Sequence, residues 1–196
     1  MSSGIFDLKS QLVIYGAHHN NKVNVIIHMI FVPIILWSAL VFGAKSGPLV
    51  DMNALPSSLQ WLKLFGPNLS FFTMCLYSVY YMILDPVAAA LASPLLFAAC
   101  YHATNFLKTN PQAIKIALSI HIAAWIFQFL GHGVAEKRSP KVLDNLVQAC
   151  VSAPYFVFFE LLFACGYRPQ LYREVRTEVE KDIAEFRARK AGKKNK

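Results

Sequence analysis

Hydrophobic positions along this chain gather in long runs that are separated by short polar segments. The apolar runs cover residues 25–44, 71–84, 87–107, 113–130 and 146–165. A helix of about 20 residues crosses ~30 Å of hydrocarbon at ~1.5 Å per residue, so runs of this length are typical of spanning helices. We therefore predict an all-α, polytopic membrane helical bundle of four or five apolar helices.

The junction at Asp85-Pro86 leaves the number of crossings open. The residue before a proline disfavours the helical conformation, which predicts a break between the second and third apolar runs. A tight hairpin of two spans and one bent element both fit this pattern.

Amphipathic segments flank the apolar part of the chain. Residues 5–21 are predicted to form a short amphipathic helix, and residues 45–68 a loop with a short interfacial helix around Trp61. Residues 174–190 carry apolar positions at helical spacing with charges between them. That pattern is typical of a basic amphipathic helix lying on a surface.

The composition indicates lipid as the solvent of the apolar runs. Hydrophobic residues make up 56% of the chain and charged residues 15%, against about 25% charged residues in soluble domains. Between Val23 and Cys165 there are twelve Lys, Arg, Asp and Glu residues. The four cysteines stand singly without a CxxC pair, which is typical of small buried apolar residues.

The net charge of +8 comes mainly from residues 167–196, which hold ten Lys and Arg against five acids. This excess follows an apolar run directly, which indicates a cytosolic segment beside anionic lipid and, without a recognition motif, argues against nucleic-acid binding. We expect a membrane-embedded domain over 1–167 and a basic cytosolic tail over 168–196. Lys193 and Lys194 form a C-terminal dilysine pattern. This pattern predicts a multi-pass protein of the endoplasmic reticulum membrane.

The histidines are the candidates for chemistry, because all six lie beside or within the apolar runs. They are His18, His19, His28, His102, His121 and His132. Each is costly there unless it has a partner, and a hydrogen bond between helices explains any one of them equally well. His121 and His132 share one helical face with Gln128 between them. Glu136 follows His132 by four residues, which places it beside the imidazole if the helix continues.

His19 and His28 are nine residues apart, on opposite faces of a straight helix. They converge only if the chain breaks between them, and Asn20-Asn21 is suited to break and cap a helix. Neutral imidazoles from two segments, with a carboxylate, suit a borderline divalent metal such as iron or zinc. The sequence holds no nucleophile motif, Gly-rich phosphate loop or HExxH zinc motif that would favour another chemistry.

Three blocks of the sequence resemble a known family. They are Tyr15-x3-His19-x-Asn21-x2-Asn24-x3-His28, Trp125-Ile-Phe-Gln128-Phe-Leu-Gly131-His132-Gly133-Val-Ala-Glu136-Lys137-Arg138, and Leu143-Asp144-Asn145-Leu-Val-Gln148. The family is that of the endoplasmic-reticulum 2-hydroxy fatty acid dioxygenases. The resemblance implies an Fe2+-dependent α-oxidation, without haem or 2-oxoglutarate. In it O2 shortens a long-chain 2-hydroxy fatty acid by one carbon during phytosphingosine breakdown.

The resemblance also implies a set of metal ligands. Carried over by position, His19, His28 and His132 become the iron ligands. His121 is a fourth metal candidate that belongs less firmly to the motif.

Residues around these histidines receive roles in the same way. Asn24, Gln128 and Glu136 become catalytic-site residues that orient the imidazoles. Lys137 and Arg138 become candidates for binding the substrate carboxylate. A basic loop at the membrane surface explains these two cations equally well.

Two other functions remain open from the sequence. A non-enzymatic lipid-binding or scaffolding membrane protein would use its histidines to pair helices, and it would carry no stoichiometric iron. A lipid hydroxylase or hydrolase that uses zinc would differ in its metal content and in its need for O2. The oligomeric state is not indicated by any pattern in the chain.

Overall fold

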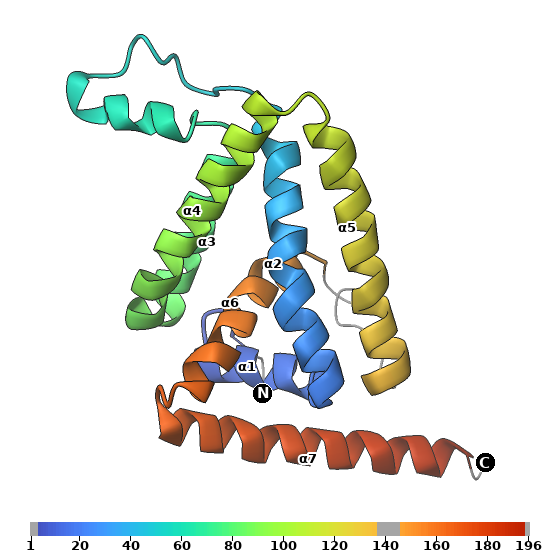
Figure 1. The fold of residues 1–196 in the computed structure, drawn as a ribbon. Coiled ribbons are helices and arrows are strands. Elements are labelled where there is room, and N and C mark those ends of the chain that lie inside the picture. The colour runs from blue at the N-terminus through green and yellow to red at the C-terminus, as the bar shows by residue number, and fades with distance from the viewer. Residues whose placement is uncertain (1–3, 137–145, 195–196) are drawn as a thin grey trace. The chain divides into compact units, whose positions relative to one another are not determined.

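The structure is a computed structural model that describes residues 4–136 and 146–194, and this part of the chain is helical without a strand. Its elements, shown in Figure 1, are α1 (Leu8–His18), α2 (Lys22–Ala44), the 3-10 helix η1 (Ser57–Leu64), α3 (Leu69–Leu84), α4 (Pro86–Thr109), α5 (Ala113–Leu130), the π-helical turn η2 (Gly131–Glu136), α6 (Leu146–Ala164) and α7 (Pro169–Lys194). The predicted all-α class is confirmed, together with the helix that follows the apolar ones.

Asp85 separates two apolar helices. α3 ends at Leu84, and α4 begins at Pro86, whose fixed φ suits the first position of a helix. The Asp85 carboxylate accepts hydrogen bonds from the backbone N–H groups of Val87 (3.1 Å) and Ala88 (3.2 Å). α3 and α4 lie side by side (Figure 1), so the two runs form a hairpin of two helices rather than one bent element.

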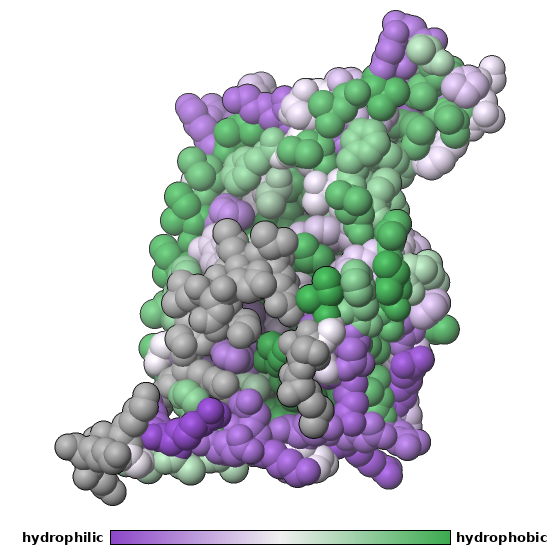
Figure 2. Space-filling view, turned by 180° about the vertical axis from the view of Figure 1, so that it is seen from behind, coloured by the Kyte–Doolittle hydropathy of each residue, from purple (hydrophilic) through white to green (hydrophobic). Residues whose placement is uncertain are grey.

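Three helical segments of the described chain are long and apolar enough to cross a membrane: α2, α4 and Ala113–Glu136, which joins α5 to η2. A fourth results if Cys150–Ala164 and Pro169–Gly192, bent by 119°, count as one span. Large apolar side chains face outward on these helices and on α3. Leu76 is 71% exposed and Ile126 is 54% exposed, and Figure 2 shows hydrophobic residues over much of the surface. Such a surface is stable against lipid chains, not against water.

Residues 30–128 form one compact unit. In it, polar side chains of neighbouring helices pair with α2. The Oγ atom of Ser38 lies 2.8 Å from Nδ1 of His121, and the hydroxyl of Ser70 donates to the carbonyl of Leu40 at 2.6 Å. These bonds satisfy polar groups that an apolar environment would otherwise penalise, and they link α2 to α3 and α5.

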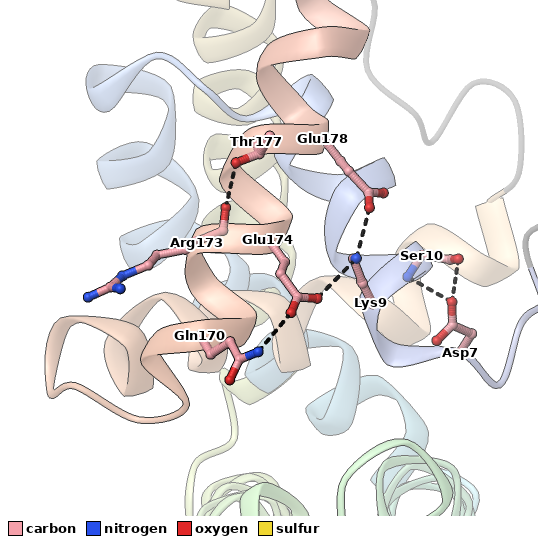
Figure 3. A network of polar contacts seen from close by, with 8 residues as sticks. All are labelled: Asp7, Lys9, Ser10, Gln170, Arg173, Glu174, Thr177 and Glu178. Atoms are coloured by element: carbon pink, nitrogen blue, oxygen red, sulfur yellow. Dashed lines mark hydrogen bonds and ion pairs between the residues drawn. The ribbon is translucent and has the colours of Figure 1, made fainter.

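Residues 1–29 and 129–196 form the other unit. Here α1 packs against α6 and α7. The ammonium group of Lys9 lies 3.0 Å from a carboxylate oxygen of Glu174 and 2.8 Å from one of Glu178 (Figure 3). One cation of α1 thus joins two successive turns of α7.

The first half of the apolar face predicted for the tail is buried in this unit. Val175 and Val179 are 6% and 1% exposed, and a Cβ atom built on Gly16 would lie 2.8 Å from a methyl carbon of Val179. Only glycine therefore allows α7 to approach α1 this closely. The helix also begins at Pro169, earlier than the predicted 174–190, because a proline at the first position starts a helix well.

Replacement of Asp85 should destabilise the protein through the start of α4. We expect Asp85→Ala to lower the free energy of unfolding by about 1–2 kcal/mol, because two buried N–H groups lose their acceptor. Asp85→Asn keeps an acceptor oxygen and should cost less than half as much. Thermal unfolding in detergent measures both, and equal losses in the two variants would contradict the capping role.

Candidate metal centre

Three histidines from separate segments meet within the unit formed by residues 1–29 and 129–196. His19 follows α1, His28 lies near the start of α2, and His132 lies in η2. The ring centroids are 4.2 Å apart for His19 and His28, 4.8 Å for His19 and His132, and 4.9 Å for His28 and His132. All three are buried, and one potential ligand atom of each lies within 4.8 Å of the others. These side chains could hold a metal ion.

The backbone fixes the orientation of two of the rings. Nδ1 of His19 lies 2.8 Å from the carbonyl oxygen of Tyr15, and Nδ1 of His28 lies 2.9 Å from that of Asn24. A carbonyl oxygen only accepts hydrogen bonds, so each Nδ1 carries the proton. The Nε2 atoms of both rings therefore keep a lone pair that is available to a metal.

His19 is held in its neutral form. Its pKa lies well below the ordinary 6.5, first because burial disfavours the charged ring, and then because the imidazoles of His28 and His132 lie beside it. Imidazole binds a metal only when it is unprotonated. Near neutral pH, His19 can therefore accept a cation without first losing a proton.

His132 supplies a nitrogen that lacks a partner. Its Nδ1 atom is buried and makes no hydrogen bond to any residue that the structure describes. A buried polar atom without a partner is costly, and a metal ion shared with His19 and His28 would remove that cost. Three neutral imidazoles suit iron, zinc, copper or nickel, so the donor set fits a transition metal.

Glu136 lies at the chain break that allows the histidines to meet. One of its carboxylate oxygens accepts hydrogen bonds from the backbone N–H groups of Asn20 (3.1 Å) and Asn21 (2.9 Å) and from the side-chain amide of Asn24 (3.2 Å). These donors precede or begin α2, where N–H groups lack partners in the helix and the helix dipole favours an anion. The carboxylate is thus bound to the loop between α1 and α2. The expected break at Asn20-Asn21 is present.

Glycine allows a close approach where η2 passes α2. A Cβ atom on Gly131 would lie 2.5 Å from Oδ1 of Asn24, whose backbone carbonyl holds His28. A Cβ atom on Gly133 would have no neighbour within 4 Å. The first glycine therefore sets the approach of His132 to α2, and the second does not.

His121 is not part of the three-histidine group. In the unit of residues 30–128, its Nδ1 lies 2.8 Å from Oγ of Ser38, and its Nε2 accepts a hydrogen bond from the indole of Trp125 at 2.9 Å. Both ring nitrogens are therefore engaged, and a metal role for His121 stays a prediction from the resemblance. Gln128 is buried, and its amide nitrogen has no hydrogen-bond partner in the described part of the chain.

Four other residues singled out in the sequence remain: two histidines that form hydrogen bonds, and two cations outside the described residues. Nδ1 of His18 lies 3.0 Å from the carbonyl of Ile14, and His102 accepts a hydrogen bond from the indole of Trp37 at 2.9 Å. Both bonds match a structural role. Lys137 and Arg138, predicted to bind the substrate, lie outside the described residues.

Tyr15 is a residue of the site for which the sequence pattern predicted no role. Its ring stacks on the imidazole of His19 with centroids 3.9 Å apart and planes 12° apart, and it contacts Phe156 of α6 at 4.9 Å. Its backbone carbonyl holds the same histidine. The spacing of four residues, one helical turn, is a signal that could have revealed this pair.

The fold and the site define an all-helical, membrane-capable chain with a buried histidine group able to bind a metal. Residues 5–165 match the model of the 2-hydroxy-palmitic acid dioxygenase Mpo1-like family, and the chain belongs to this family. The chain is 36% identical over 186 residues to the 2-hydroxy-palmitic acid dioxygenase MPO1 of Saccharomyces cerevisiae (strain ATCC 204508 / S288c). The aligned region covers 92% of this chain and 94% of the yeast protein. No solved structure matches the chain. The family and the dioxygenase class expected from the sequence are confirmed.

The two glycines of η2 offer a matched test of the site. We expect Gly131→Ala to weaken metal affinity by about tenfold or more, because the new methyl group displaces the Asn24 side chain, which bonds Glu136 beside the histidines. Gly133→Ala adds the same methyl group in open space and should leave metal affinity unchanged. Titration of purified protein with Co2+ measures both variants, and equal affinities would contradict the assigned role of Gly131.

Proposed function

We propose that this protein is an iron(II)-dependent dioxygenase that converts long-chain 2-hydroxy fatty acids to the acid one carbon shorter, as a step of phytosphingosine breakdown. The single observation that supports this most is the buried group of His19, His28 and His132 in a member of the dioxygenase family. The name of the yeast relative supports the substrate class.

The proposed reaction needs no reductant other than the substrate. Oxidation of a 2-hydroxy acid to the shorter acid and carbon dioxide releases four electrons and four protons, with one water consumed. One O2 accepts these four electrons, so one O2 and one 2-hydroxy acid give the shorter acid, carbon dioxide and one water. This balance supports a site that contains a metal and no second cofactor.

The chemistry of the reaction favours iron among the metals that imidazole binds. Zinc has no redox chemistry, whereas iron(II) would supply the electron transfer to O2 and the Lewis acidity that binds a 2-hydroxy carboxylate. The ligands in this proposal are His19, His28 and His132. His121 is left out because both of its nitrogens are engaged.

The surrounding residues hold the ligands. In this proposal Tyr15 and Asn24 orient the rings of His19 and His28 through their carbonyls, and Glu136 holds the loop between those histidines. One oxygen of the Glu136 carboxylate binds N–H donors of this loop, and the group of potential ligands is made of the three histidines without Glu136. Glu136 and Asn24 are thus positioning residues.

An apolar environment suits the substrate as well as the helices. Each CH2 group moved out of water contributes ~0.8 kcal/mol, so a long acyl chain gains most of its affinity from lipid or apolar side chains. We propose that the acyl chain stays in the bilayer region while the carboxylate and 2-hydroxyl group reach the histidines. Lys137 and Arg138 remain candidates for the carboxylate.

Removal of any one of the three histidines should abolish the activity. We expect His19→Ala, His28→Ala and His132→Ala each to lower formation of the C15 acid from 2-hydroxypalmitate by about 100-fold or more, with loss of bound iron. The assay uses membranes supplied with Fe2+ and O2, and metal analysis of the purified protein accompanies it. His102→Ala is the matched control and should remain active.

Undiminished product from all three variants would contradict the metal assignment. A wild-type protein that binds no metal would favour the lipid-binding or scaffolding alternative. Zinc in place of iron, with turnover that is independent of O2, would favour the hydrolase alternative.

The contact between α1 and α7 bears on membrane topology. α1 precedes the first spanning helix and α7 follows the last apolar one, and the Lys9–Glu174 and Lys9–Glu178 ion pairs require both helices to lie on one side of the bilayer. The chain between them therefore crosses an even number of times, which supports four crossings over five. We propose an endoplasmic reticulum protein with residues 1–167 in the membrane domain, and the tail and α1 on the cytosolic side.

Tags on the two ends of the chain test this topology. We expect an N-terminal and a C-terminal tag both to be digested when protease is added to intact microsomes, because α1 and α7 share one side. A lumenal marker that stays protected controls for leakage. Digestion of one tag alone would contradict the shared side, and protection of both would place the shared side in the lumen.

A further inference from the structure

Arg176 of α7 contacts the loop that carries His19. Its guanidinium donates a hydrogen bond to Oδ1 of Asn20 at 3.1 Å, and Asn20 directly follows His19. The backbone N–H of the same asparagine donates to Glu136 at 3.1 Å. Asn20 is thus bonded from α7 through its side chain and from η2 through its backbone.

A weaker contact lies beside this hydrogen bond. One Nη atom of Arg176 lies 4.0 Å from a carboxylate oxygen of Glu180, one turn further along α7. An arginine offers five N–H donors in a fixed plane, so it can bond Asn20 while it neutralises a carboxylate. A lysine has one charged nitrogen and no such plane.

The helix that presents Arg176 is itself fixed on α1. Val179, three residues after Arg176, lies against Gly16. Lys9 pairs with Glu174 and Glu178, which stand before and after Arg176 in α7 (Figure 3). Three residues place Val179 and Arg176 on neighbouring parts of one helical face. The close approach at Gly16 therefore sets how near Arg176 comes to the end of α1.

We propose that Arg176 is a positioning residue for the metal centre and that α7 is a functional part of the site. The helix lies beyond the segment 5–165 that matches the family, so this role is additional to the shared motif. Arg176 holds the Asn20 side chain, which keeps the backbone of Asn20 directed at Glu136 and the ring of His19 directed at His28 and His132. The proposal rests on the proposed function only in assuming that the three histidines bind a metal.

Metal affinity measured without substrate tests the proposal. Full-length protein in detergent is titrated with Co2+, and its unfolding temperature is recorded for each variant. We expect Arg176→Ala and Asn20→Ala each to weaken Co2+ binding about tenfold, in the range typical of residues behind a metal ligand. The double variant should be no weaker than either single one, because both remove one interaction. Arg176→Lys should restore part of the affinity.

Arg187→Ala is the matched control, since it removes the same charge from an exposed position of the same helix. It should bind Co2+ as the wild type does. Arg176→Ala with unchanged affinity, or additive losses in the double variant, would overturn the positioning role. An equal loss in Arg187→Ala would do the same, because it would show an effect of net charge. Wild-type protein without Co2+ binding would instead contradict the proposed function.

Discussion

The carboxylate of Glu136 joins segments that are more than a hundred residues apart in the chain. It accepts hydrogen bonds from the backbone N–H groups of Asn20 and Asn21, which directly precede α2, and from the side-chain amide of Asn24. This interaction brings η2 onto the break between α1 and α2. His19, His28 and His132 lie on the segments joined in this way, so the proposed metal centre depends on it.

The same interaction shapes the chemistry of the site. Three donors bind one oxygen of the Glu136 carboxylate, and the cluster of potential metal ligands in the described residues consists of three histidines. Burial lowers the pKa of His19, and the carbonyls behind His19 and His28 fix which nitrogen carries the proton. His132 adds a buried nitrogen without a hydrogen-bond partner among the described residues. The three imidazoles together offer lone pairs but carry no charge. In the proposed function, such a set would leave the charge of a divalent cation available to attract an anionic substrate.

The helices at the two ends of the chain pack on each other beside this site. α1 ends at His18, directly before His19, and α7 lies on α1 through the Gly16 contact and the ion pairs of Lys9. Exposed ion pairs contribute little to stability by themselves, whereas the close apolar contact of Val179 excludes water. α7 is therefore held on α1 mainly by apolar packing.

The sequence alone determined the helices and their membrane character, because apolar runs and the Asp85-Pro86 break are local signals that do not depend on distant residues. It also pointed to the three histidines, through the break at Asn20-Asn21 and the family blocks. Only the tertiary structure decided that Glu136 binds the loop and that Arg176 reaches Asn20, since both contacts join positions more than a hundred residues apart. No periodicity encodes such a pair. These contacts depend on how the helices of the unit pack, so they can be seen only in the folded chain.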